Sequence, residues 1–514
     1  MKTKAFLCKV GMVIVTCLLI SVATLTTLSV QAAPGDLIQR VYTDKARYHP
    51  GDIVTITVEI KNNTGVDWSG TLYLDVRYLE TLVHSDGQSL SIAAGATATK
   101  TFTWTTPSTD FRGYHVEVRA GTTDANATAI DVSSDWTRYP RYGFVYAFTP
   151  GQTQAQSQEK IRLLAENYHI NAVQFYDWMW RHEQVISRTN GIINDPWYDW
   201  AGNPISFAVI QDLVAAAHNY RMAAMPYFMI YGALQNYQQI SKVNPQWGLY
   251  FDTSHTNQVV FDFGDDDPNT NLWIFNPFNT NWQNYIFRQY DDAILTLDFD
   301  GIHLDQMGNY WNTTYYDYWG NVVDLGNSFS ALINNAKEHV SALAYHTPGK
   351  MGKDILTFNM VNGGVNAWGV NDVVRNSNVN FLYSEIWENS ATYKDIYDFV
   401  RQSRADSGGK AIVLAAYPNY YENTGPRYEA EDATLYNVGI NNNHPGYTGT
   451  GFVDQFLDNN TPTALGVEIY IQTDAQPTSV TGTNLSWSYD AATGRVKLYG
   501  TLGANTSQDI VINF

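Results

Sequence analysis

Cysteine is almost absent from this sequence. The 514 residues contain two, Cys8 and Cys17, and both fall within the first 32 positions. If that segment is removed, the chain has no thiol, which excludes disulfide bonds, thiolate metal ligands and a cysteine nucleophile. Stability must then come from buried cores, and a chain of roughly 480 residues can supply these across two to four domains.

Long apolar runs are absent after the N-terminal segment. The segment begins with Lys2, Lys4 and Lys9, continues with an apolar run over 10–30, and ends in small residues up to Ala32. This order predicts a secretory signal peptide over residues 1–32, with a membrane anchor as the alternative. No later stretch reaches the roughly 18 apolar residues that span a bilayer. We therefore expect a secreted, extracellular protein that has no membrane partner once the signal is removed.

Positive charge is also scarce. Lysine and arginine number 31 against 50 aspartates and glutamates, and loss of the three signal lysines leaves 28 − 50 = −22. An acidic surface argues against nucleic acid or an anionic membrane as a partner. The 15 tryptophans and 35 tyrosines instead suit a neutral, hydroxyl-rich ligand whose ring faces stack on aromatic side chains.

The first region after the signal alternates apolar and polar residues between turns. YHPGDIVTITVEIKNNTG and GTLYLDVRYLE are typical of its short antiparallel strands. Such strands at regular spacing predict an immunoglobulin-like β-sandwich over residues 33–138. It contains no cluster of catalytic residue types, so we expect a structural or docking role.

The second region, over residues 139–425, combines strand-like and helical patterns. Its near-continuous apolar runs lie at 143–150, 171–180, 221–233, 299–308, 355–363, 380–388 and 411–420. Apolar strands that alternate with helices predict a parallel sheet covered on its faces, here a (β/α)8-type barrel with its site at the carboxyl ends of the strands. Only seven units are visible. Either VEIYIQ (467–472) closes the barrel, or the barrel lacks its last unit.

Asp305 ends the fourth predicted strand, in FDGIHLDQMG (299–308). Ile302 and Leu304 share one parity and can pack on helices, while His303 and Asp305 share the other and can face the lumen. A carboxylate at the lip of an apolar barrel is costly unless it is hydrogen-bonded or used in chemistry. A helix cap is the structural alternative.

Glu385 ends the sixth predicted strand in the same way, in NFLYSEIWE (380–388). Strands four and six are two positions apart, about 10 Å at roughly 4.8 Å per strand. Inward-leaning side chains could close that to the roughly 5–5.5 Å of a retaining glycosidase pair. Glu388, of opposite parity, is the alternative on this segment.

The two carboxyl groups would need different protonation states. Asp305, at a polar strand end beside Gln306, suits the ionised nucleophile. Glu385, flanked by Tyr383 and Trp387, lies in an apolar setting that favours the protonated acid/base.

Six segments carry a resemblance to a known family. They are LIQRVYTDKARYHPGD (37–52), FYDWMWRHE (175–183), MPYFMIYGA (225–233), NPFNTNWQNYI (276–286), FDGIHLDQMG (299–308) and LYSEIWE (382–388). They resemble glycoside hydrolase family 66, which holds endodextranases and cycloisomaltooligosaccharide glucanotransferases. The resemblance implies a retaining attack on α-1,6-linked glucan (dextran), with Asp305 as nucleophile and Glu385 as acid/base, and no cofactor for catalysis.

The resemblance also implies a set of substrate-binding residues at the barrel mouth. They are Trp178, His182, Tyr227, Tyr231, Asn279, Gln306 and Trp387. His182 has a structural histidine as its alternative role.

The stretch from YEAEDA resembles the opening of a family 35 carbohydrate-binding module, and we assign residues 426–462 to a truncated module-like segment. The resemblance implies a structural calcium ion on Glu429 and Glu431, whose i, i+2 spacing places both on one face of a strand. Residues 463–514 alternate again and predict a C-terminal β domain. Compared with the family, the rest of the module and the last barrel unit are missing, which resembles an internal deletion.

Three functions follow as hypotheses. The first is an extracellular, monomeric glucanotransferase that closes α-1,6-glucan into cycloisomaltooligosaccharides. The second is an endodextranase, which would use the same covalent intermediate with water as acceptor. The third is a glucan-binding protein whose catalysis is impaired by the deletion.

Overall fold

The computed structural model describes residues 35–122, 124–263, 267–307, 313–361, 370–386 and 393–416, and short segments between 439 and 513. The chain divides into two compact units, Met1–Ala416 and Tyr417–Phe514. The predicted signal peptide (1–32), Trp387, Glu388, Glu429 and Glu431 lie outside the described residues. In the described part, no helix has the length and apolar character needed to cross a membrane.

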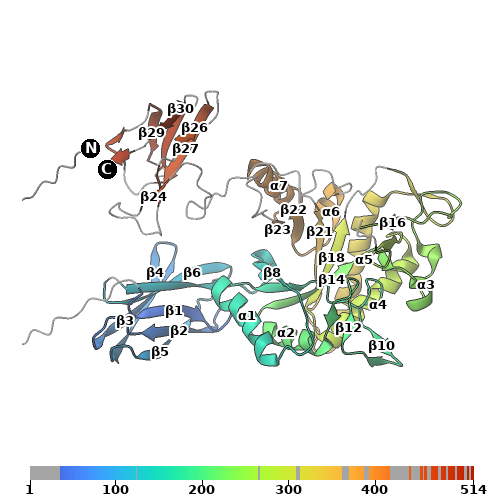
Figure 1. Cartoon of the computed structure of the whole chain (residues 1–514), viewed down its shortest axis with the longest axis horizontal. Coiled ribbons are helices and arrows are strands. Elements are labelled where there is room, and N and C mark those ends of the chain that lie inside the picture. The colour runs from blue at the N-terminus through green and yellow to red at the C-terminus, as the bar shows by residue number, and fades with distance from the viewer. Residues whose placement is uncertain are drawn as a thin grey trace, which may run out of the picture. The chain divides into compact units, whose positions relative to one another are not determined.

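Two antiparallel sheets open the first unit (Figure 1). One has the order β1 (Ile38–Thr43), β2 (Ile53–Lys61), β5 (Thr97–Thr105), and the other β4 (Thr81–Ile92), β3 (Trp68–Tyr78), β6 (Arg112–Ala120), β7 (Asp124–Val132). Alternate residues of β2 and β3, such as Ile56 and Leu74, are fully buried in one shared core. The alternation of apolar and polar residues therefore leads to two packed sheets. The assignment of this region to an immunoglobulin-like fold stays a prediction.

A seven-stranded parallel sheet follows, with the order β23-β22-β21-β18-β14-β9-β8. Its strands are β8 (Tyr142–Val145), β9 (Ala172–Phe175), β14 (Ala223–Met229), β18 (Gly301–Met307), β21 (Ile355–Met360), β22 (Leu382–Ile386) and β23 (Ile412–Ala416). Six of these strands lie within the predicted runs, and β8 begins one residue before its run. The sheet is of the TIM-barrel type, with neighbouring strands consecutive in the chain.

Helices alternate with these strands. They are α1 (Gln154–Tyr168), α2 (Phe207–Asn219), α4 (Thr280–Leu297), α5 (Leu325–His346), α6 (Val370–Asn376) and α7 (Tyr393–Asp406). Local sequence sets several ends: Thr153 and Gln156 form a capping box at α1, and Ser206 caps α2. Gly301 allows close approach of β18 and β21, because a Cβ there would lie 1.9 Å from the carbonyl oxygen of Ile355.

Short elements lie in the connections of the first unit, one before the first barrel strand and the others between barrel strands and helices. They are η1 (Trp136–Arg138), β10 (Arg188–Thr189), β11 (Ile192–Ile193), β12 (Trp197–Tyr198), β13 (Pro204–Ile205), β15 (Gly232–Leu234), α3 (Tyr237–Ile240), η2 (Pro245–Trp247), β16 (Val260–Phe261), β17 (Leu272–Ile274), β19 (Tyr315–Tyr316) and β20 (Val322–Val323). Most of them fall in the long loops after β9, β14 and β18.

Glu183 anchors the loop after β9. Its side chain is fully buried, where it pairs with Arg181 (Nε to Oε1, 2.5 Å) and accepts from the Ser241 hydroxyl and the Leu234 backbone N–H. We expect Glu183→Ala to lower the free energy of unfolding by about 3–5 kcal/mol, because Arg181 would keep a buried charge without its partner. Urea denaturation measures this. Glu338→Ala, on the exposed face of α5, is the control, and equal losses in both variants would contradict the prediction.

The second unit contains antiparallel strand pairs. The strands are β24 (Gly439–Asn441), β25 (Phe452–Asp454), β26 (Leu457–Asn459), β27 (Leu465–Gln472), β28 (Ser479–Thr481), β29 (Ser486–Asp490), β30 (Arg495–Leu502), β31 (Thr506–Gln508) and β32 (Val511–Asn513). The VEIYIQ segment lies in β27, which pairs antiparallel with β30. Among the described strands, the parallel sheet has seven members and β27 is not one of them.

Candidate active site

Asp305 lies near the carboxyl end of β18 and is 6% exposed. Ile302 and Leu304 are fully buried in the main hydrophobic core. His303, of the other parity, contacts Tyr142 of β8 across the sheet. The alternation predicted for this strand is confirmed, and it places Asp305 on the inner face of the sheet.

Two side chains hold the Asp305 carboxylate. The Tyr227 hydroxyl of β14 donates to Oδ2 at 2.8 Å, and the Asn359 amide of β21 donates to Oδ1 at 2.7 Å. Burial raises the pKa of Tyr227 well above its usual range, so this hydroxyl remains a donor. Both carboxylate oxygens therefore accept hydrogen bonds, an arrangement that favours the ionised form of Asp305.

Asn359 also contacts the strand that carries Glu385. Its Oδ1 accepts the backbone N–H of Glu385 at 3.0 Å, while its amide N–H donates to Asp305. Glu385 is 8% exposed near the carboxyl end of β22. Since β21 lies between β18 and β22, one amide side chain on the middle strand links the two carboxylate-bearing strands.

Opposing effects act on the Asp305 carboxyl group. Burial raises the pKa of Asp305 well above its usual range, and the charge of Glu385 raises it further. The hydrogen bonds from Tyr227 and Asn359 lower it. Burial and the nearby negative charge outweigh the two hydrogen bonds, so the net direction for the pKa of Asp305 is upward.

Asp177 is a third carboxylate near the pair, on the segment that follows β9. Burial raises the pKa of Asp177 to about 6, and the charges of Asp199 and Glu385 add to the effect. Asp177 in turn raises the pKa of Asp305. Asp177 was not among the residues predicted from the sequence, although it follows its strand, NAVQF, much as Asp305 ends its own.

Replacing Asp177 with asparagine is expected to stabilise the protein above pH 6. Unfolded Asp ionises near pH 3.8, whereas folded Asp177 keeps its proton to about pH 6, so stability falls as pH rises through that window. The full penalty at pH 8 is at most about 3 kcal/mol, from a difference of about two pKa units. Melting temperatures at pH 4 and pH 8 test this. An increase in melting temperature at pH 4 equal to that at pH 8 would contradict the prediction. Asp86→Asn, at an exposed position of β4, is the control.

Beneath the carboxylates lies a neutral aromatic layer. Tyr142 stacks on His303 at 5.7 Å between ring centroids, its hydroxyl lies 3.0 Å from Nδ1, and Tyr383 meets the same imidazole edge-on at 4.6 Å. Burial lowers the pKa of His303 to about 3, so the ring is uncharged at neutral pH. This layer adds no positive charge that would stabilise a second carboxylate.

The predicted substrate-binding residues divide into two groups. Tyr227 touches Asp305, and the half-buried Gln306 follows Asp305 directly. His182, Tyr231 and Asn279 have other surroundings. His182 is 4% exposed, and burial lowers its pKa to about 3, while Tyr231 is 2% exposed and packs on Phe329. Asn279 caps α4 by accepting from Asn281 and Trp282.

Trp178 requires a correction. Its side chain is fully buried between Phe228 and Phe299, and its indole N–H donates to the carbonyl of Tyr227 at 3.1 Å. A sugar ring cannot stack on it in this position. Tyr231 lies in the core and Asn279 caps a helix, and their predicted roles in substrate binding stay predictions. Sequence shows that an aromatic residue follows a strand, but not which way its ring turns.

Metal ligands do not gather in the described part of the chain, where no group of three or more His, Cys, Asp or Glu side chains is placed to hold an ion. The predicted calcium ligands, Glu429 and Glu431, and the predicted subsite residue Trp387 lie outside it.

Comparison with known proteins decides the family. The model of glycosyl hydrolase family 66 matches residues 43–465. This chain belongs to that family. The match contains all seven barrel strands and both carboxylates, so the family resemblance predicted from sequence is confirmed. The resemblance of residues 426–462 to a family 35 module stays a prediction.

Three enzymes are similar to this chain over much of its length. Two cycloisomaltooligosaccharide glucanotransferases from Niallia circulans are 52% and 49% identical, over 82% and 84% of the chain. A dextranase from Streptococcus salivarius is 24% identical over 68% of it. These alignments cover 42–43% of the relatives, so the chain spans less than half of their length.

A solved structure is similar as well. The crystal structure of a cycloisomaltooligosaccharide glucanotransferase from Paenibacillus sp., in complex with cycloisomaltoheptaose, is 42% identical and superposes with a TM-score of 0.71. The alignment covers 94% of this chain and 70% of the Paenibacillus chain. The two chains therefore share their fold.

Proposed function

We propose that this protein is a retaining glucanotransferase that converts α-1,6-glucan into cycloisomaltooligosaccharides. The observation that carries the proposal is the Asn359 link, which joins the buried Asp305 carboxylate to the Glu385 strand. The similarity to two glucanotransferases at about half identity supports this substrate class. The signal-like segment over 1–32 supports action outside the cell, and we propose a monomer, since both carboxylates come from one chain.

In the proposed first step, an Asp305 oxygen attacks the anomeric carbon and forms a covalent glycosyl–enzyme bond. Glu385 gives its proton to the glycosidic oxygen, which leaves as a hydroxyl on the released chain. The hydrogen bonds from Tyr227 and Asn359 support this assignment, because both Asp305 oxygens accept a hydrogen bond, which orients the carboxylate and favours its charged form.

In the second step, Glu385 acts as a base. It takes the proton of an incoming hydroxyl, whose oxygen attacks the anomeric carbon and releases Asp305 as a carboxylate. If the hydroxyl belongs to the non-reducing end of the same chain, a ring forms, and if it belongs to water, the product is linear. The carboxylate pair serves both outcomes, so the acceptor decides between them.

Two alternatives compete with cyclisation. The dextranase from Streptococcus salivarius supports hydrolysis by the same pair. The described parallel sheet has seven strands, which supports a glucan-binding protein with impaired catalysis. In a closed eight-stranded barrel every strand has a neighbour on both sides, so the first and last strands are buried rather than left as edges.

Incubation of the full chain with dextran, followed by mass analysis, tests the proposal. Cyclic products lack one water relative to linear oligosaccharides of equal length, and we expect them to dominate. Linear products alone would favour the dextranase. A sample that unfolds cooperatively and is stabilised by dextran, but yields no product, would favour the impaired glucan-binding protein.

A further inference from the structure

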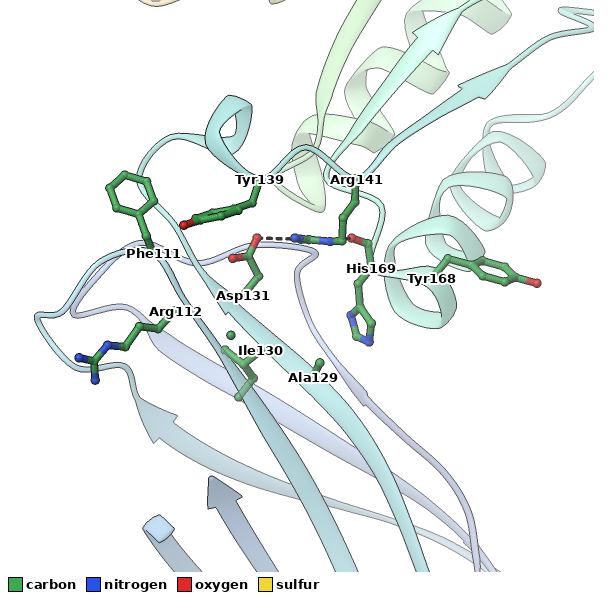
Figure 2. A pocket seen from close by; sticks show the side chains of 10 residues that line it. Phe111, Arg112, Ala129, Ile130, Asp131, Tyr139, Arg141, Tyr168 and His169 are labelled. Carbon is green, nitrogen blue, oxygen red and sulfur yellow. Dashed lines mark hydrogen bonds and ion pairs between the residues drawn. The ribbon is translucent and has the colours of Figure 1, made fainter. Parts of the chain in front are cut away.

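A hollow lies beside the segments that lead into the first two barrel strands (Figure 2). It has a volume of about 410 Å³ and is formed where the N-terminal sheets meet the start of the barrel. Arg141 and His169 line it, immediately before β8 and β9 begin, whereas Asp305 and Glu385 lie near the strands' carboxyl ends. A seven-residue strand at roughly 3.3 Å per residue separates the two places by about 20 Å. The hollow is therefore not a subsite of the catalytic pair.

An ion pair and an exposed aromatic ring define the hollow. Arg141 donates to Asp131 Oδ2 at 2.7 Å, and Figure 2 shows this pair beneath the ring of Tyr139. The Tyr139 side chain is 52% exposed. The floor is bare, since Gly113 and Ala129 contribute almost no side chain, and a Cβ on Gly113 would meet no atom within 4 Å.

Three arginines lie around the hollow. The Arg138 guanidinium lies 4.2 Å over the Phe111 ring, and Arg112 lies 4.2 Å over Tyr78, contacts that leave both groups charged. Arg141 is neutralised by Asp131. This neutral pair fits a ligand with adjacent hydroxyls, because a carboxylate can accept from one hydroxyl while a guanidinium donates to the next.

We propose that this hollow is a secondary binding site for glucan, with Tyr139 as the stacking surface and the Asp131–Arg141 pair as the hydroxyl-binding group. Its volume falls in the range of small-molecule sites, and aromatic faces with a few fixed polar groups are their usual lining. The choice of glucan rests on the proposed function, whereas the site itself does not. Such a site would hold a long glucan chain while its remote part reaches the carboxylates.

The test uses the full chain carrying Asp305→Asn, which removes turnover, and calorimetric titration with isomaltohexaose. Tyr139→Ala should weaken one binding step at least tenfold. Gly113→Leu should do the same by filling the floor, where a Cβ meets no atom within 4 Å. Tyr73→Ala, an exposed tyrosine on β3 outside the hollow, is the matched control and should bind as the parent does.

Each outcome is decisive. Parent-like binding by both Tyr139→Ala and Gly113→Leu overturns the site, and equal weakening by Tyr73→Ala does so as well. Melting curves establish that each variant is folded, and Gly113→Leu replaces Tyr139→Ala if the latter is not. If the chain with Asp305 intact makes no product from dextran while Tyr139→Ala still loses a binding step, the proposed function fails and the secondary site stands.

Discussion

Asp305→Asn should reduce turnover of dextran by a factor on the order of 10⁴, because an amide cannot form the glycosyl–enzyme bond. Asparagine has nearly the shape of aspartate and can still accept a hydrogen bond from Tyr227. Glucan binding should therefore stay within a few-fold of the parent. Rates on dextran and calorimetric affinities measure the two effects separately.

The roles of the two carboxylates can be distinguished by chemical rescue of Asp305→Ala. Azide would fill the space left by the carboxylate and attack the anomeric carbon of an activated α-glucoside, giving the β-glycosyl azide. Asp86→Asn, on exposed β4, is the control for general loss of charge and should keep full activity. Full activity in Asp305→Asn would remove Asp305 from the nucleophile role.

Glu385→Gln should slow dextran turnover by roughly 10²–10⁴-fold, because the leaving oxygen would receive no proton. An α-glucoside with an acidic leaving group needs no such proton, so its first step should be nearly unaffected and the glycosyl–enzyme should accumulate. Azide added to this variant should give the α-glycosyl azide, the opposite configuration to that expected for Asp305→Ala.

Two glutamates serve as comparisons for Glu385→Gln. Glu338→Gln, on the exposed face of α5, should leave the activity on dextran unchanged. Glu388→Gln tests the alternative glutamate of the same segment. A large loss in that variant together with a small loss in Glu385→Gln would transfer the acid/base role to Glu388.

The strands and their order could be predicted from the sequence because both depend on local pattern. Near-continuous apolar runs such as ILTFNM (355–360) are strands that can be buried on both faces, and parallel strands joined by helices lie beside each other in chain order. Parity then assigns Asp305 and Leu304 to opposite faces of β18. The predicted location of Asp305 follows from these two regularities.

Contacts between strands could not be predicted in this way. Asn359 was passed over, although it has the inward parity on β21, because an amide in an apolar strand has no chemistry of its own until its neighbours are known. Asp177 was missed for the same reason. Trp178 was assigned to the substrate from the family resemblance, whereas its ring lies in the core.

The sequence by itself determined the family, the seven barrel strands and the two carboxylates at their ends, because periodicity and residue type along a strand decide burial and face. The tertiary structure decided which groups meet: the Asn359 link, the Asp177 charge beside Glu385, and the hollow between Tyr139 and Asp131. These arrangements depend on side chains from segments distant in the chain, and the distances and shared burial that set their hydrogen bonds and pKa values exist only after the segments have packed.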